Sequence, residues 1–293
     1  MDISKKEQVI KIFVLSLIFI IGLVFYRDYG LTLDDEYYRI NGFFYKDYIV
    51  EYFHNLISFQ PLQYDLLAEK IQNNPLSNHP ALFETLVAFL ADFFRIKEIK
   101  SVYELSHLLN FLIYFCSLVV LMEVVNNRYK SNYFSILSVV IIFTTPRFFA
   151  ESFYNSRDIF FFSVFVFFLY AAQRLILNDS LKNLIFFAFT SALLISAKIL
   201  GIIPYFIFSI MYGIYIFENN KKTNHNIRKL LLLASTTLFF LIVCWPYLWI
   251  NPFDNLIFAF LEIVRSHESV QVLTFFNGEY LISNNTPSYF RII

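Results

Sequence analysis

The chain has 293 residues, of which 58% are hydrophobic, 20% aromatic and only 16% charged, with 38 Phe and a formal net charge of zero. Soluble domains carry about 25% charged residues, so this chain cannot cover its surface with charge, and its apolar content excludes a disordered protein. The balanced charge excludes a nucleic-acid partner bound through bulk positive charge, and the composition predicts an integral membrane protein surrounded by membrane lipids.

Seven segments are predicted to cross the membrane, because a spanning helix needs about 17–25 mostly apolar residues. The first has no small-residue cleavage site after it and is expected to be an uncleaved anchor. The fifth and sixth are short and are separated by a turn at Gly201 and Pro204. In chain order the predicted spans are residues 9–26, 105–125, 133–149, 159–177, 184–200, 202–217 and 230–250. The sequence therefore predicts a single, all-α transmembrane domain over residues 1–293.

Basic residues in the short loops predict the orientation, since Lys and Arg collect in cytoplasmic loops. With a cytoplasmic N-terminus every inside segment is positively charged, and the segment over residues 221–229 is strongly basic. The outer face then receives a long first loop (27–104), the turn around Lys198 and a tail (251–293). The apolar run 81–90 within the first loop predicts interfacial helices.

The first loop opens with three consecutive carboxylates, Asp34, Asp35 and Glu36. Neighbouring carboxylates repel one another, which favours binding a proton or a cation and suits a general base or a metal ligand. The alternative is an acidic loop that is simply solvated.

Cationic and polar groups also lie at the predicted outer ends of the spans. His79 precedes the interfacial run, where exposed backbone N–H groups favour an anion, although a lone histidine is more often structural than functional. Arg147 and Arg157 can bind phosphate in a fork geometry. Asp158 faces an apolar run, either as a functional acid or as a helix cap paired with Arg157. Lys198 either binds phosphate or extends to the outer interface.

All these groups fall on the outer face in an orientation chosen only from cytoplasmic Lys and Arg. Carboxylates for acid–base chemistry next to cations for phosphate are the groups needed to displace a phosphate leaving group. The sequence has no Walker-type phosphate loop, zinc-spaced Cys/His cluster or Gly-x-Ser-x-Gly elbow. Nucleotide-driven transport by this chain alone is therefore not expected.

Short motifs run through almost the whole chain in a fixed order. They are Tyr29-Gly30, Asp35-Glu36, Asn41-Gly42, His79-Pro80, Pro146-Arg147-Phe148-Phe149, Phe153-Tyr154-Asn155, Arg157-Asp158, Trp245-Pro246-Tyr247-Leu248-Trp249, Asn251-Pro252 and Phe276-Asn277-Gly278-Glu279-Tyr280. In this order they resemble bacterial membrane glycosyltransferases of the GT-C superfamily, in the family-39-like group of protein O-mannosyltransferases and lipid A aminoarabinose transferases.

The resemblance implies an inverting sugar transfer from a polyprenyl-phosphate donor to a hydroxyl of a lipid, glycan or protein acceptor. The site would lie on the extracytoplasmic face of a bacterial inner membrane. Asp35, next to Glu36, would be the general base, and Asp158 a second acid that orients the acceptor or, with Asp35, holds a divalent cation such as Mg²⁺ or Mn²⁺. The residues expected around the donor phosphate are Arg147, Lys198, His79 and Arg157.

The chain departs from the family pattern in two places. Ala81 stands where a second proline is usual, and family members usually carry further spans after the region that matches Asn277-Gly278-Glu279. A truncated chain, or one completed by a partner that supplies C-terminal helices, is therefore expected. Two other functions stay open: a non-catalytic lipid-linked-sugar binder or flippase component, and a structural membrane subunit.

Overall fold

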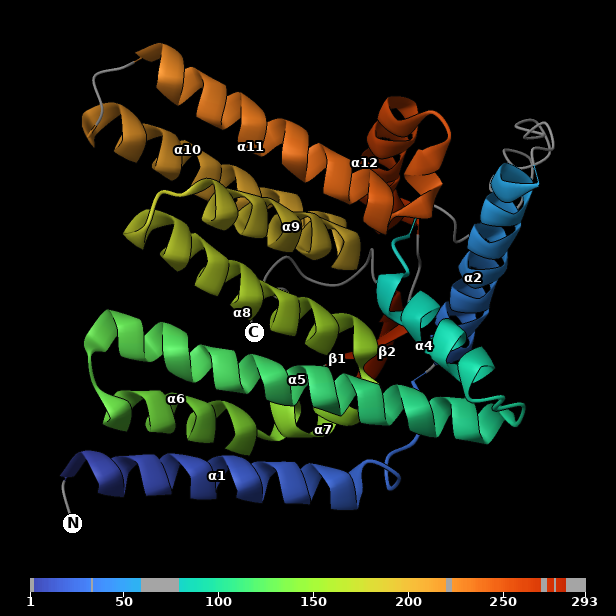
Figure 1. The fold of residues 1–293 in the computed structure, drawn as a ribbon. Coiled ribbons are helices and arrows are strands. Elements are labelled where there is room, and N and C mark those ends of the chain that lie inside the picture. The colour runs from blue at the N-terminus through green and yellow to red at the C-terminus, as the bar shows by residue number, and fades with distance from the viewer. Residues whose placement is uncertain are drawn as a thin grey trace.

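The computed structural model describes residues 3–32, 34–58, 79–219, 223–269, 273–276 and 278–282. These residues form mainly helices, joined by short turns (Figure 1). The helices are α1 (Ile3–Phe25), α2 (Asp35–Ile57), α4 (Leu82–Phe93), α5 (Ile99–Tyr129), α6 (Asn132–Thr144), α7 (Pro146–Tyr154), α8 (Ser156–Leu177), α9 (Leu181–Ala197), α10 (Ile202–Asn219), α11 (Thr223–Cys244) and α12 (Pro252–Ser269). Two 3-10 turns, η1 (Ile199–Gly201) and η2 (Pro246–Trp249), and an antiparallel hairpin of β1 (Leu273–Phe276) and β2 (Glu279–Ile282) complete the described elements.

Five helices are long and apolar enough to cross a membrane: α1, α5, α8, α10 together with η1, and α11. They match the predicted spans 9–26, 105–125, 159–177, 202–217 and 230–250. The pair α6 and α7 passes the same test together, although it is bent by 69°, and α9 is a shorter apolar helix of 17 residues. The protein is thus an all-α membrane protein in its main body, and the count of about seven spans stays a prediction.

The predicted third span, 133–149, is wrong as one continuous helix. α6 ends at Thr144, Thr145 has an extended backbone with ψ of 118°, and Pro146 begins α7. Proline has no N–H for the helix ladder and disfavours helical geometry in the residue before it, but it is well tolerated at a first helical position. The last predicted span, 230–250, is also too long at its end. The observed helix α11 ends at Cys244, two residues before Pro246, for the same reason.

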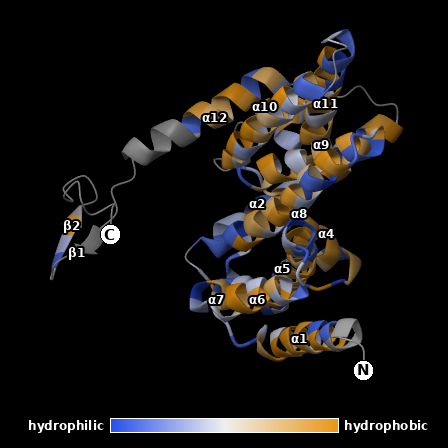
Figure 2. Ribbon diagram, turned by 90° about the vertical axis from the view of Figure 1, so that its left-hand side faces the viewer, coloured by the Kyte–Doolittle hydropathy of each residue, from blue (hydrophilic) through white to orange (hydrophobic). Residues whose placement is uncertain are grey.

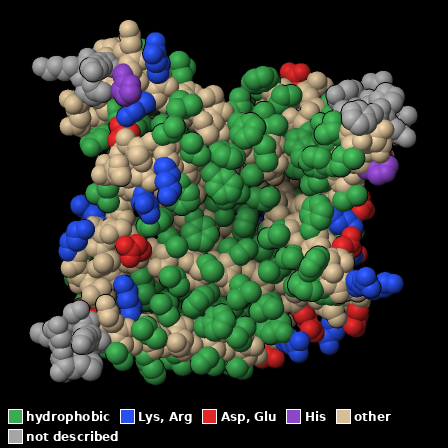
Figure 3. Space-filling view, in the orientation of Figure 1, with side chains coloured by type: hydrophobic (Ala, Val, Ile, Leu, Met, Phe, Trp, Pro, Cys, Tyr) green, Lys and Arg blue, Asp and Glu red, His purple; other side chains and the backbone are tan. Residues whose placement is uncertain are grey.

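The surface of the bundle matches the requirements of a lipid environment. Figure 3 shows a broad hydrophobic face whose Lys, Arg, Asp and Glu side chains lie mainly along two opposite margins, near the ends of the long helices. Hydrophobic colours also dominate α1 in the rotated view (Figure 2). On this helix Ile12 and Phe13 are 66% and 65% exposed, which soluble proteins rarely allow over a large area.

The interior consists of aromatic and aliphatic side chains that join helices distant in sequence. One cluster, which includes Phe168 and Phe187, joins α8, α9, α10 and α11. A second, built around Phe111 and Phe153, joins α1, α5 and α7. These clusters fix the positions of the helix ends.

Helix α4 covers part of the predicted interfacial run 81–90 and packs into the protein along one side. Phe83 and Val87 are buried against α2 and α5, whereas Leu86 remains 43% exposed. At the crossing with α2, a Cβ on Gly42 would lie 2.5 Å from the backbone carbonyl of Glu84. Glycine therefore permits the close contact that brings the start of α4 next to α2.

Candidate functional site

The helix ends that carry the predicted site residues meet at one end of the bundle. The C-terminal ends of α1 and α9 lie there with the N-terminal ends of α2 and α8, next to α7 and α4 (Figure 1). The chain passes back and forth between the two ends, so every second connection returns to this one. The structure thus places the acidic run, His79, Arg147, Asp158 and Lys198 at the same end.

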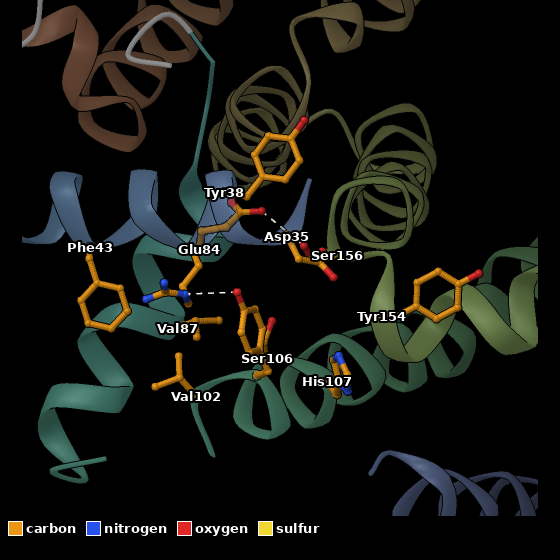
Figure 4. A pocket seen from close by; sticks show the side chains of 12 residues that line it. Asp35, Tyr38, Phe43, Glu84, Val87, Val102, Ser106, His107, Tyr154 and Ser156 are labelled. Atoms are coloured by element: carbon orange, nitrogen blue, oxygen red, sulfur yellow. Dashed lines mark hydrogen bonds between the residues drawn. The ribbon is translucent and has the colours of Figure 1, made fainter. Parts of the chain in front are cut away.

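A pocket opens between α2, α4, α5 and the junction of α7 with α8. It contains about 420 Å³ of empty space, including the part open to solvent. Figure 4 shows the lining side chains converging from these helices. They are Asp35, Tyr38, Arg39, Phe43, Glu84, Val87, Val102, Tyr103, Ser106, His107, Tyr154 and Ser156.

The three consecutive carboxylates have different surroundings. Asp35 is half-buried and lines the pocket, and its Oδ2 accepts a hydrogen bond of 2.5 Å from the backbone N–H of Thr32. Asp34 occupies the N-cap position of α2 without a side-chain cap bond and is exposed, and Glu36 is also exposed. Only Asp35 of the run therefore presents its carboxylate to the pocket.

Glu84 is a second carboxyl in this pocket, on the first turn of α4. Ser156 Oγ donates a hydrogen bond to its Oε1 over 3.3 Å (Figure 4). Burial raises the pKa of the Glu84 carboxyl, and the negative charge of Asp35 adds to this, while Arg157 and the bond from Ser156 oppose it. Glu84 is not among the predicted site residues, although an acidic residue inside an apolar run is a usable signal.

Arg157 connects the start of α8 to α2. Its guanidinium carbon lies 4.2 Å from the centre of the Tyr38 ring, and Nη1 donates a hydrogen bond to the Tyr38 hydroxyl. Within the described part of the chain, no carboxylate forms a salt bridge with Arg157. Arg157 is thus a cation whose charge is available to an anionic ligand.

His79 lies shortly before α4 and is close enough to Arg157 for the two side chains to interact electrostatically. Burial lowers the pKa of its imidazole, the charge of Arg157 lowers it further, and Glu262 opposes these effects. The imidazole is therefore neutral at neutral pH. Ser77 and Asn78, which precede it, lie outside the described residues.

Asp158 pairs with Lys198 rather than with Arg157, so the alternative of a helix cap paired with Arg157 is wrong. Lys198 is the C-cap residue of α9, and its Nζ donates a hydrogen bond to Asp158 Oδ1 within an ion pair. The cap of α8 is Asn155, whose Oδ1 accepts a 3.1 Å hydrogen bond from the Asp158 backbone N–H. Its Nδ2 donates to Asp158 Oδ2 over 3.0 Å. Consecutive helical residues point about 100° apart, which directs Arg157 towards α2 and Asp158 towards α9.

Arg147 has a 78% exposed side chain and pairs with Glu151 one turn later over 2.8 Å. It does not line the pocket, although it lies near enough to Asp158 to interact with it electrostatically. Of the four predicted phosphate-binding residues, Arg157 interacts electrostatically with the pocket carboxyl of Glu84, and His79 interacts with Arg157. Lys198 and Arg147 are held in ion pairs with Asp158 and Glu151.

Contacts among several residues hold the pocket walls in place. The ring of Tyr29 stacks on Phe153 with centroids 4.7 Å apart. His107 Nδ1 contacts the Tyr26 carbonyl oxygen over 3.2 Å, and Asn110 Nδ2 donates to the Ser152 carbonyl over 3.0 Å. The end of α1, helix α5 and helix α7 are thereby fixed around the pocket.

The arrangement does not form a multidentate metal site. No three His, Cys, Asp or Glu side chains within the described ranges could together hold a metal ion. Asp35 faces the pocket, whereas both oxygens of Asp158 are engaged by Lys198 and Asn155. The two carboxylates considered as ligands of a divalent cation, Asp35 and Asp158, thus do not line the same pocket.

Comparison with protein-family models, with curated protein sequences and with solved structures finds no match for this chain. The resemblance to GT-C glycosyltransferases therefore rests on the sequence motifs alone.

Proposed function

We propose that the protein is a membrane glycosyltransferase that moves a sugar from a polyprenyl-phosphate donor to an acceptor hydroxyl. The observation that carries this proposal is the pocket at one end of an apolar helical bundle, where Asp35 and Glu84 line the space and the charge of Arg157 acts on the Glu84 carboxyl. A carboxylate and an available guanidinium provide the base and the phosphate ligand that such a transfer requires.

The reaction is a displacement at the anomeric carbon of the donor sugar. The acceptor oxygen forms a bond to this carbon as its proton passes to a carboxylate oxygen of Asp35. The bond from the carbon to the phosphate oxygen breaks on the opposite face, which inverts the configuration. Both electrons of that bond leave with the polyprenyl phosphate, whose new negative charge is stabilised by Arg157.

An apolar cleft next to the site supports a lipid-linked donor. It lies between α2, α4 and the end of α11, and contains about 690 Å³ of empty space, including the part open to solvent. Its walls include Ile49, Leu86, Phe89 and Val243. A hydrocarbon chain in such a cleft would remove apolar surface from water, at about 25 cal/mol per Å².

The proposal predicts a specific lipid accumulation. Cells that lack the gene should accumulate a polyprenyl-phosphate sugar in their lipid extract, because donor synthesis continues without its consumer. Mass spectrometry of extracts from cells with and without the gene measures this. Purified protein in vesicles should then transfer the sugar from that lipid to acceptor hydroxyls. A protein that binds the lipid but transfers nothing, with any acceptor, would instead be a non-catalytic binder or flippase component.

The proposed orientation places the N-terminus in the cytoplasm of a bacterial inner membrane and the pocket outside. It predicts that a cysteine replacing Lys100, at the pocket end of α5, reacts with a membrane-impermeant maleimide on intact cells. A cysteine replacing Arg128, at the other end, should react only after lysis. Both changes are made in a Cys116→Ala, Cys244→Ala background. The reverse labelling pattern would place the pocket in the cytoplasm.

A further inference from the structure

Helix α12 follows the last spanning helix and runs in a different direction. Helix α11 has 22 residues, or about 33 Å at 1.5 Å per residue, so it is long enough to cross the roughly 30 Å hydrocarbon core. Asn251, with a positive φ of 49°, turns the chain into Pro252 at the start of α12. The long helices run across the view of Figure 1, where α12 is foreshortened, and α12 extends across the view of Figure 2 after the 90° turn. Helix α12 therefore lies across the direction of the spans, at the pocket end of the bundle.

An aromatic cluster lies at the start of α12. Trp249 belongs to the turn η2 between α11 and α12, and its indole N–H donates a hydrogen bond to the Ile242 carbonyl over 2.8 Å. The Tyr52 and Phe53 rings of α2 lie against it, with centroids 4.7 Å and 5.9 Å from that of Trp249. Trp and Tyr concentrate where the hydrocarbon of a membrane meets water. The cluster and the end of α11 thus place the start of α12 at the membrane–water boundary.

One face of α12 packs against the protein. Ala259 is completely buried in the hydrophobic cluster that joins α8, α9, α10 and α11. Asn255 Nδ2, one turn earlier, donates a hydrogen bond to the Tyr247 carbonyl over 2.8 Å. Glu262, one turn after Ala259, lies close enough to His79 and Tyr247 to interact electrostatically with both. These contacts fix the rotation of α12 about its own axis.

The opposite face of α12 carries large apolar side chains that belong to none of the hydrophobic clusters formed by the described residues. They are between 43% and 65% exposed, and most follow the spacing i, i+4, i+7, i+8 that places residues along one side of a helix. They are Phe253, Ile257, Phe258, Phe260 and Leu261. Asp254 lies beside them in the first turn, where the helix dipole favours an acid. An exposed apolar patch of this kind marks an interaction surface.

We propose that α12 is an interfacial helix whose free apolar face inserts into the lipid leaflet at the pocket end of the bundle. Lipid is the partner of this face because α12 starts at the hydrocarbon boundary, lies across the spans and extends beyond the bundle (Figure 2). Such helices bury their apolar face about 5–10 Å into the boundary between headgroups and acyl chains. Since Glu262 interacts with His79, docking of α12 also places His79 near the level of the headgroups. The inference goes beyond the proposed function and does not depend on it.

The test measures the depth of α12 in phosphatidylcholine vesicles that contain the full chain. Ile257→Cys and Leu261→Cys, one turn apart on the free face, are each made in the Cys116→Ala, Cys244→Ala background and labelled with the fluorophore NBD. Both labels should emit at shorter wavelength than a label at Lys100→Cys, where the native side chain is 79% exposed, because apolar surroundings shift NBD emission to the blue. A nitroxide near the headgroup end of the lipid chain should quench both labels more than one at the chain terminus, since the helix lies about 5–10 Å deep. The thermal transition in detergent should match that of the unlabelled protein.

Four results would overturn the proposal. Emission like that at Lys100→Cys, without quenching, would place the face in water. Blue-shifted emission without quenching by lipid would show that protein, such as a second copy of the chain, covers it. Stronger quenching from the chain terminus would make α12 part of a span. Quenching unchanged by Phe253→Ser, Phe258→Ser and Phe260→Ser together would attribute the insertion to the label itself.

These outcomes are separate from those for the proposed function. Lipid quenching of α12 in a protein that transfers no sugar would refute the glycosyltransferase activity and leave the interfacial helix in place. Sugar transfer by a protein whose α12 lies in water would refute only the membrane contact of α12.

Discussion

Asp35→Asn should lower the rate of sugar transfer in reconstituted vesicles by about 10²–10⁴-fold, the usual contribution of a general base. The amide has no appreciable basicity, so no general base accepts the proton of the acceptor hydroxyl in the transition state. The variant should still fold, because the Asn side-chain oxygen can accept the hydrogen bond that the Thr32 N–H donates to Asp35. The rate is measured with radiolabelled polyprenyl-phosphate sugar, and folding by the thermal transition in detergent.

Asp34→Asn is the matched control for this experiment. Asp34 is adjacent in sequence and carries the same group, but it is exposed and makes no cap bond through its side chain. Its replacement should leave the rate within about twofold of the wild type, because exposed charges contribute little. Equal losses in both variants would indicate a general effect of negative charge, and full activity of Asp35→Asn would remove Asp35 from the mechanism.

Gly42→Ala should destabilise the protein by about 1–3 kcal/mol, the typical cost of overpacking. The added Cβ would lie 2.5 Å from both the carbonyl carbon and the carbonyl oxygen of Glu84. Backbone cannot rotate away as a flexible side chain can, so α4 must move from α2. This cost exceeds the gain in helix propensity from Gly to Ala, about 1 kcal/mol.

Gly213→Ala on α10 provides the comparison for Gly42. There the nearest atom to an added Cβ is a side-chain carbon of Leu230 at 3.6 Å, an ordinary contact. Only the propensity gain remains, and the midpoint of thermal unfolding should stay level or rise. Differential scanning fluorimetry on both variants measures the contrast. A Gly42→Ala protein as stable as Gly213→Ala would show that α2 and α4 are not in such close contact.

Residue spacing predicted the helical membrane character and most helix positions, but it misplaced the third span. The apolar run from residue 133 to 149 is long enough to cross a membrane, and length alone suggested one helix. Pro146 decides otherwise, because it cannot continue the hydrogen-bond ladder of α6 and instead begins α7. This local rule was readable in the sequence.

The candidate site was only partly predictable. The orientation predicted from basic loops put Asp35, Arg157 and Lys198 on the same side of the membrane. The structure places all three at one end of the bundle. The sequence could not show that Asp158 would pair with Lys198, which is 40 positions away, or that Ser156 would contact Glu84 across 72 positions. Such pairs depend on how each helix is rotated about its axis.

The sequence by itself thus determined a helical chain in a membrane, because crossing the hydrocarbon region demands long apolar stretches that each segment carries locally. The motif resemblance already pointed to Asp35, but only the tertiary structure showed that its two acidic neighbours do not line the pocket and brought Glu84 into the same space. The physical reason is the crossing of α2 and α4 at Gly42, where the absence of a side chain fixes which residues meet.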